Sequence, residues 1–69
     1  MTKTIEMTGK RWMQMIEANK DDAAAATAIE EVNAALNSYR ESIAHLYGSE
    51  EALIMAVANK TIAINLTIG

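Results

Sequence analysis

His45 is the only side chain in this sequence whose ordinary pKa lies close to neutral pH. Glu41 precedes it by four residues, so on a helix the carboxylate and the imidazole would lie on one face and could pair. Such a pair can move a proton, but catalysis also needs a nucleophile or a metal beside it. The sequence offers neither next to His45, and we expect a solvent-exposed histidine.

The remaining residue types also give little support for catalysis. There is no cysteine and only one histidine, which excludes a structural zinc site made of Cys and His. Glu30-Glu31 and Glu50-Glu51 are neighbours in sequence, and neighbours on a helix point in different directions. No glycine-rich loop could hold a phosphate. We therefore predict no catalytic residue, no metal site, no cofactor and no enzymatic activity.

The most unusual local composition is Trp12 with Met13 and Met15, and Lys10 and Arg11 directly precede the tryptophan. Tryptophan and methionine make adaptable contact surfaces, and an aromatic side chain beside two cations is typical of an anchor for a protein partner. The sequence therefore predicts partner contacts at Trp12, Lys10 and Arg11. The alternative is a small core that uses methionine as filler.

Charge and hydropathy limit the other partner classes. The net charge is −3 and the six basic residues are scattered, which disfavours nucleic acid as a partner, because its binding depends on phosphate contacts. No stretch approaches the roughly 18 uninterrupted apolar residues of a membrane span, and residues 1–15 are too polar for a secretory signal. We expect no membrane association and a cytoplasmic location, in a bacterium or in a host cell if the gene is viral.

Apolar residues repeat at alternating spacings of three and four through the middle of the chain, which predicts a helix with a narrow apolar seam. The helix should begin at the acidic pair Asp21-Asp22, whose carboxylates suit a helix start, and stop at Gly48, which can take the left-handed conformation. These signals give bounds of about 22–47. We call these residues the heptad seam: Ile29, Val32, Leu36, Tyr39, Ile43 and Leu46.

This helix is long for so short a chain. Its residues would span roughly 39 Å, whereas a compact chain of this length forms a sphere only about 28 Å across. We therefore predict a homodimer or higher oligomer with the heptad seam as its interface; an ordinary helical hairpin within one chain is the rival. In such an oligomer Tyr39 could line a shared pocket near Arg40, which would suit a small anionic ligand.

The C-terminal third predicts a second helix and a strand. Ser49 followed by Glu50 and Glu51 is typical of a helix start, and this helix should span about 50–59 with Leu53, Ile54 and Val57 buried. Over residues 61–68 apolar and polar residues alternate strictly, which favours a strand. A helical continuation is the alternative.

At the N-terminus, residues 2–8 also alternate and predict a strand. A turn at Thr8-Gly9 would then lead into a returning strand over 11–17. The competing interpretation is a short helix capped by Thr8, although Lys10 and Arg11 in its first turn would oppose the helix dipole. In that helix one face would carry Trp12, Met15, Ile16 and Asn19.

Together these patterns predict a single α+β domain over 1–69 with the order ββααβ, in which a three-stranded sheet packs on one long and one short helix. The alternative is an all-α helical hairpin. Many phage and plasmid accessory proteins are likewise tiny, acidic and cysteine-free, with one helix that is long for the size of the chain. We therefore expect a non-enzymatic, oligomeric inhibitor or modulator of a larger protein partner. The alternatives are a protein that sequesters an anionic metabolite or nucleotide at an oligomer interface, and, third, a dimeric transcriptional regulator or antitoxin.

Overall fold

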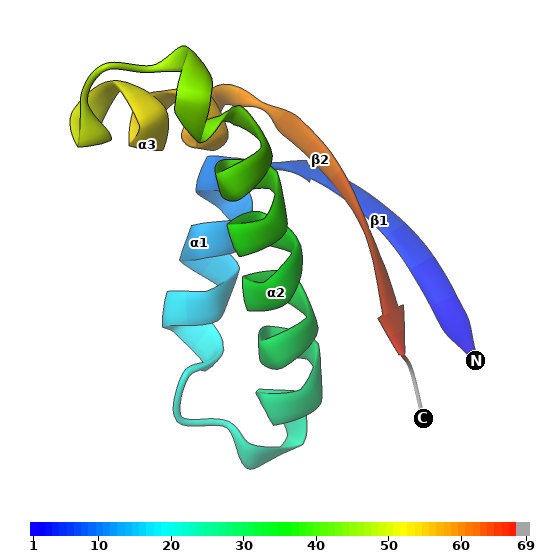
Figure 1. Cartoon of the computed structure of the whole chain (residues 1–69). Coiled ribbons are helices and arrows are strands. Elements are labelled where there is room, and N and C mark those ends of the chain that lie inside the picture. Colours follow the sequence, from blue (N-terminus) through cyan, green and yellow to red (C-terminus); the bar gives the residue numbers. More distant parts are fainter. Residues whose placement is uncertain (68–69) are drawn as a thin grey trace.

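A computed structural model describes residues 1–67 and shows an α+β arrangement, which confirms the predicted class (Figure 1). Short 3-10 turns at Ala23–Ala25 and Ala44–Leu46 flank the longest helix. The strands and α-helices follow in the order β1 (Thr2–Thr8), α1 (Gly9–Asn19), α2 (Ala26–Ile43), α3 (Glu50–Asn59) and β2 (Thr61–Thr67).

The sheet consists of the two ends of the chain. β1 and β2 pair antiparallel, in an unbroken register that places Thr2 opposite Thr67 and Thr8 opposite Thr61. The prediction of a three-stranded sheet is therefore wrong, and the two strands equally exclude an all-α hairpin. The predicted strand over 61–68 corresponds to β2, and its last residue, Ile68, lies outside the described residues.

The strand predicted over 11–17 is a helix, α1, as in the competing interpretation. The Thr8 hydroxyl accepts a hydrogen bond from the backbone N–H of Arg11 at 3.3 Å, which caps the helix start. Such a cap contributes about 1 kcal/mol, comparable to or larger than the effect of an exposed cation near a helix terminus, which solvent and salt screen further. The unfavourable position of Lys10 and Arg11 was therefore too weak a signal to exclude a helix.

The predicted long helix is α-helical only in its middle part, and a 3-10 turn replaces it at each end. The Asp22 side chain accepts from the N–H of Ala24 at 2.9 Å and so caps a 3-10 turn, and α2 proper begins at Ala26. Its 18 residues span about 27 Å, shorter than the predicted rod. Gly48 does not adopt the predicted left-handed conformation, since no glycine in residues 1–67 has a positive φ.

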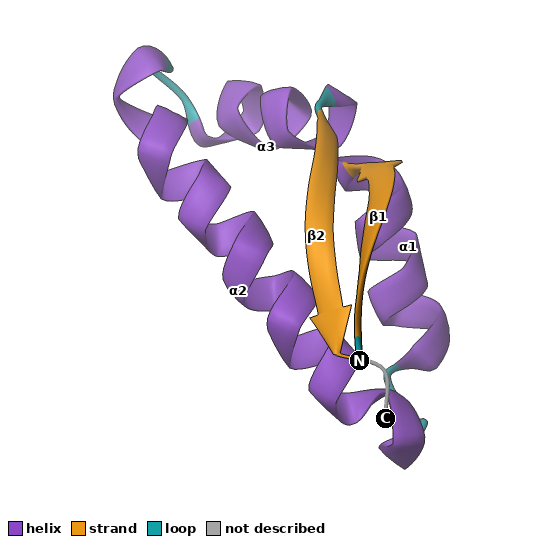
Figure 2. Cartoon of the chain, turned by 90° about the vertical axis from the view of Figure 1, so that its right-hand side faces the viewer, coloured by secondary structure: helices purple, strands orange, loops and turns teal. Residues whose placement is uncertain are grey.

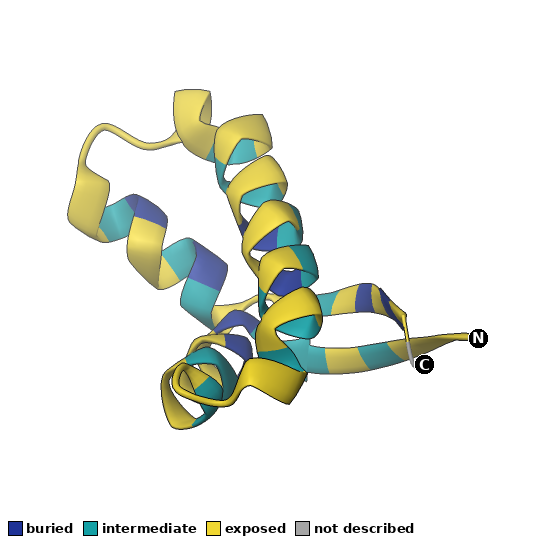
Figure 3. Ribbon diagram, turned by 90° about the horizontal axis from the view of Figure 1, so that it is seen from below, coloured by how far each residue is buried: buried dark blue, intermediate teal, exposed yellow. Residues whose placement is uncertain are grey.

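The ribbon of β1 and β2 forms one layer, and the helices form the other (Figures 1 and 2). Trp12 joins them, because its indole Nε1–H donates to the carbonyl oxygen of Ile62 at 2.9 Å. In Figure 3 the buried residues lie on the inward sides of the elements. The core cluster consists of Trp12, Val32, Leu36, Val57, Ile64 and Leu66.

Gly9 allows α1 to begin directly against the end of α3. Its N–H donates to the carbonyl oxygen of Lys60 at 2.9 Å. A Cβ atom at this position would lie 2.0 Å from the carbonyl oxygen of Val57, far inside van der Waals contact. Only glycine therefore permits this backbone approach.

The molecule is long and thin. Its principal extents are 40 × 23 × 15 Å and its radius of gyration is 12.5 Å. A compact chain of 69 residues would have a radius of gyration of about 11 Å. The described elements therefore leave more surface uncovered than a sphere would.

Candidate functional site

A groove lies where the three helices meet, and we call it the helical groove. Its apolar half has a volume of about 270 Å³. An adjoining polar half of about 310 Å³ shares Asn37 and Arg40 with it. The apolar half is lined by Met13 of α1, by Asn33, Leu36, Asn37 and Arg40 of α2, and by Ile54 and Val57 of α3.

Buried side chains form the floor of the apolar half and exposed ones its rim. Leu36 and Val57 belong to the core cluster, so the floor is fixed by the packing of the domain. Ile54, on the rim, is 48% exposed, and Met13, which lines the groove from α1, is also exposed. An apolar floor with exposed apolar side chains at its edge can take up apolar groups of a partner.

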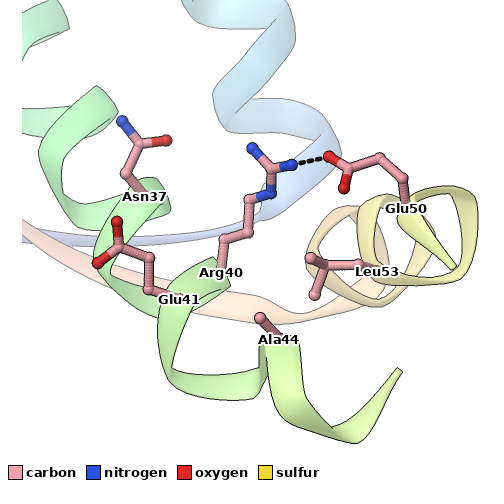
Figure 4. Close-up of a pocket in the computed structure, with 6 residues that line it drawn as sticks. All are labelled: Asn37, Arg40, Glu41, Ala44, Glu50 and Leu53. Carbon is pink, nitrogen blue, oxygen red and sulfur yellow. Dashed lines mark ion pairs between the residues drawn. The ribbon is translucent and has the colours of Figure 1, made fainter. Parts of the chain in front are cut away.

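Figure 4 shows the polar half. The guanidinium of Arg40 on α2 forms an ion pair with the carboxylate of Glu50 in the first turn of α3. Glu41 lines the same hollow. The Arg40 side chain is partly exposed and that of Glu50 largely exposed, so the pair contributes about 0–1 kcal/mol and can exchange for other partners. With two carboxylates and one guanidinium, this half is net negative.

The helix α3 is apolar on more than its inward face. Leu53 and Val57 are buried, while Ile54 and Met55 between them are exposed. In the preceding turn Leu46 and Tyr47 are exposed as well. A helix that is apolar on several faces is normally covered by other protein, so this end of the molecule is suited to binding. Ile54 was expected to be buried, and its exposure corrects that expectation.

The heptad seam packs within its own chain. Val32 and Leu36 are buried in the core, and Tyr39 and Ile43 pack against it in partly buried positions. Ile29 is partly buried, whereas Leu46 is 65% exposed and lies in the 3-10 turn. Because the core already occupies Val32 and Leu36, these two cannot also face a second copy without opening the domain.

The structure separates the three residues predicted to bind a partner. Trp12 is 0% exposed, and this corrects the expectation of an exposed anchor, because a fully enclosed indole has no surface left for a partner. Lys10 and Arg11 are exposed on α1. Trp12 faces inward because it lies on the same face of α1 as Met15 and Ile16, which pack against the core.

The residues considered for catalysis do not form a site in the described structure. His45 and Glu41 are both exposed, and no hydrogen bond joins them in the described structure. Residues 1–67 contain no cluster of three or more histidine, cysteine or acidic side chains able to hold a metal. Within the same residues, none of the helices combines the length and the apolar character needed to cross a bilayer.

Comparisons with protein-family models, with curated proteins and with solved structures found no match to this chain.

Proposed function

We propose that this chain is a small non-enzymatic interaction protein that binds a larger protein through the helical groove and thereby inhibits or modulates it. The proposal rests mainly on one observation: Met13 of α1 and Ile54 of α3 are exposed and line a groove whose apolar floor belongs to the core. A fixed floor with exposed apolar rims resembles surfaces that bind an amphipathic helix. We place this activity in the cytoplasm, in a phage or plasmid setting.

The two halves of the groove define the chemistry of the bound segment. The apolar half accepts aliphatic or aromatic side chains between Met13 and Ile54. The polar half is net negative, so it favours a lysine or arginine at the end of the segment, which would share the carboxylates of Glu41 and Glu50. We therefore propose an amphipathic helix with a basic end as the bound segment.

The ligand-binding alternative has one supporting observation, the guanidinium of Arg40 in the polar half. An anionic metabolite or nucleotide would have to displace Glu50 from Arg40 and tolerate Glu41 nearby. Nucleic acid, and with it a regulator or antitoxin role, is disfavoured by the net charge of −3. The protein partner is thus the function that the groove supports best.

Affinity capture tests the proposal. The tagged protein is incubated with lysate of the cells that carry the gene or of their host, and captured proteins and small molecules are both identified by mass spectrometry. The variant Ile54→Glu introduces a charge at the groove rim, whereas Thr61→Glu introduces the same charge at an exposed position of β2. Both variants should retain the wild-type circular dichroism spectrum.

We expect a protein that is captured by the wild type and by Thr61→Glu but is lost with Ile54→Glu. Capture of a small molecule alone would favour the ligand-binding alternative. If every captured protein binds all three forms equally, the helical groove is not the contact surface.

A further inference from the structure

The outer edge of β1 carries backbone groups without partners in the described structure. Gly9 donates to Lys60, and this bond continues the ladder in which Lys3, Ile5 and Met7 face β2. Because successive residues of a strand direct their backbone groups to opposite sides, those of Thr2, Thr4 and Glu6 point away from β2. Outside the ladder between the two strands, no hydrogen bond within residues 1–67 engages the backbone N–H or C=O groups of Thr2, Thr4 or Glu6.

The opposite edge of the ribbon is engaged by α2 at its C-terminal end, at Thr67. The Glu31 carboxylate on α2 accepts from the backbone N–H of Thr67 at 3.2 and 3.3 Å and from its hydroxyl at 3.3 Å. In Figure 2, α2 lies on the β2 side of the ribbon and approaches β2 obliquely toward its lower end, and α1 lies on the β1 side. Open edges are usually protected by proline, by bulges, by charged side chains or by a covering element. β1 carries two charged residues, Lys3 and Glu6, but it has no proline, and its register with β2 contains no bulge.

Burial also decreases across the ribbon toward the open edge. Ile64 and Leu66 on β2 are buried in the core. Their cross-strand neighbours on β1 are less covered, since Ile5 is partly buried and Lys3 is exposed. The stability of a two-stranded ribbon is marginal by itself. Additional strands at the open edge would extend the sheet and cover more of its apolar side chains.

We propose that β1 pairs antiparallel with β1 of a second copy, which joins the two ribbons into one four-stranded sheet. A two-fold axis through the edge produces this antiparallel pairing and keeps the helices of both copies on the same side of the sheet. Ile5 is the middle residue of β1, so a pairing that engages the whole strand has its two-fold axis at Ile5. It places Ile5 of each copy opposite Ile5 of the other, and Lys3 opposite Met7, so that like charges do not face each other.

The exposed area is consistent with a second copy. The chain exposes 4833 Å², whereas a monomeric protein of the same mass exposes about 4,250 Å² on average. The excess for two copies together is about 1,200 Å², the lower end of the area buried in specific protein interfaces. This inference is independent of the helical groove, and Ile54→Glu should associate as the wild type does.

Sedimentation equilibrium over a concentration series tests the pairing. We expect the wild type to reach twice the chain mass of 7.5 kDa. Thr4→Pro removes an N–H that points away from β2, so the ladder within the ribbon remains intact. Two-fold symmetry makes this a loss of two hydrogen bonds per dimer, and the dissociation constant should rise about tenfold or more.

Thr4→Ala is the matched control, because it removes the side-chain hydrogen bond to Asn65 but retains the N–H, and it should dimerise like the wild type. Should Thr4→Pro fail to fold, amide hydrogen exchange of the wild type provides the second measurement. The amides of Thr4 and Glu6 should be protected at high concentration and exchange faster on dilution. The proposal is overturned if the mass stays at 7.5 kDa at all concentrations. It is also overturned if folded Thr4→Pro has the wild-type dissociation constant, or if these amides exchange fast in a dimer.

Discussion

At the residue scale, Trp12 shows how one side chain connects the two layers. It is fully buried, and its indole N–H donates to a carbonyl oxygen of β2. We predict that Trp12→Phe lowers the free energy of unfolding by about 1–3 kcal/mol, because the hydrogen bond and part of the packing are lost. Urea titration followed by circular dichroism measures this change. An unchanged midpoint would indicate that Trp12 is exposed in solution.

Gly9 provides a second prediction at this scale. Gly9→Ala should reduce the free energy of unfolding by about 1–3 kcal/mol, because the new Cβ atom would meet backbone at the end of α3, which cannot move aside without separating the helices. Gly48→Ala is the matched control: a Cβ atom there has no neighbour within 4 Å. That control should be neutral or slightly stabilising in the same denaturant titration. Equal destabilisation by the two changes would contradict the close approach.

Several residue roles could be predicted from the sequence and others could not. The cap at Ser49 and the exposure of His45 follow from local chemistry, which the sequence contains directly. Trp12 could not be assigned, because tryptophan beside methionine is as suitable for a core as for an exposed anchor. Only the packing partners decide between these roles, and they are far away in the sequence.

At the scale of elements, the heptad seam provides a matched pair of substitutions. Leu36 is 8% exposed and Leu46 is 65% exposed, although both belong to the same repeat. We predict that Leu36→Ala lowers the free energy of unfolding by about 2–5 kcal/mol, the usual range for a buried leucine. Leu46→Ala should cost less than about 1 kcal/mol. Thermal and urea unfolding measure the free energy of unfolding of both variants. Similar destabilisation by the two substitutions would show that Leu46 is covered too, so that the seam continues beyond Ile43.

The heptad pattern predicted the helix but not what packs against it. A narrow apolar seam fits a second helix, and it fits equally well the apolar face of a ribbon such as β2. The alternation over residues 2–8 and 61–67 identified both strands, since strand periodicity is local. The number of strands in the sheet depended on residues 11–17, where the cap at Thr8 outweighed the unfavourable charges of the first helical turn.

At the scale of the whole molecule, the predicted mismatch between a long helix and a small body is resolved in two ways. The α-helix extends only from Ala26 to Ile43, which is shorter than predicted, and the body is elongated, with a longest extent of 40 Å. In this elongated body Ile54 and Met55 of α3 are exposed, and so is Lys3 of β1. The helical groove could not be predicted from the sequence, because Met13, Leu36 and Ile54 come from three helices whose relative placement only the fold determines.

Contact at the helical groove is tested most directly by photocrosslinking in the cells that produce the protein. A photoreactive amino acid replaces Ile54 at the groove rim or, as the control, Thr61 on the exposed face of the ribbon. Irradiation followed by mass spectrometry identifies proteins bonded at each position. We predict a discrete crosslink to a larger protein from position 54 and none to that protein from position 61. Crosslinks from position 61 alone, or the same products from both positions, would contradict binding through the groove.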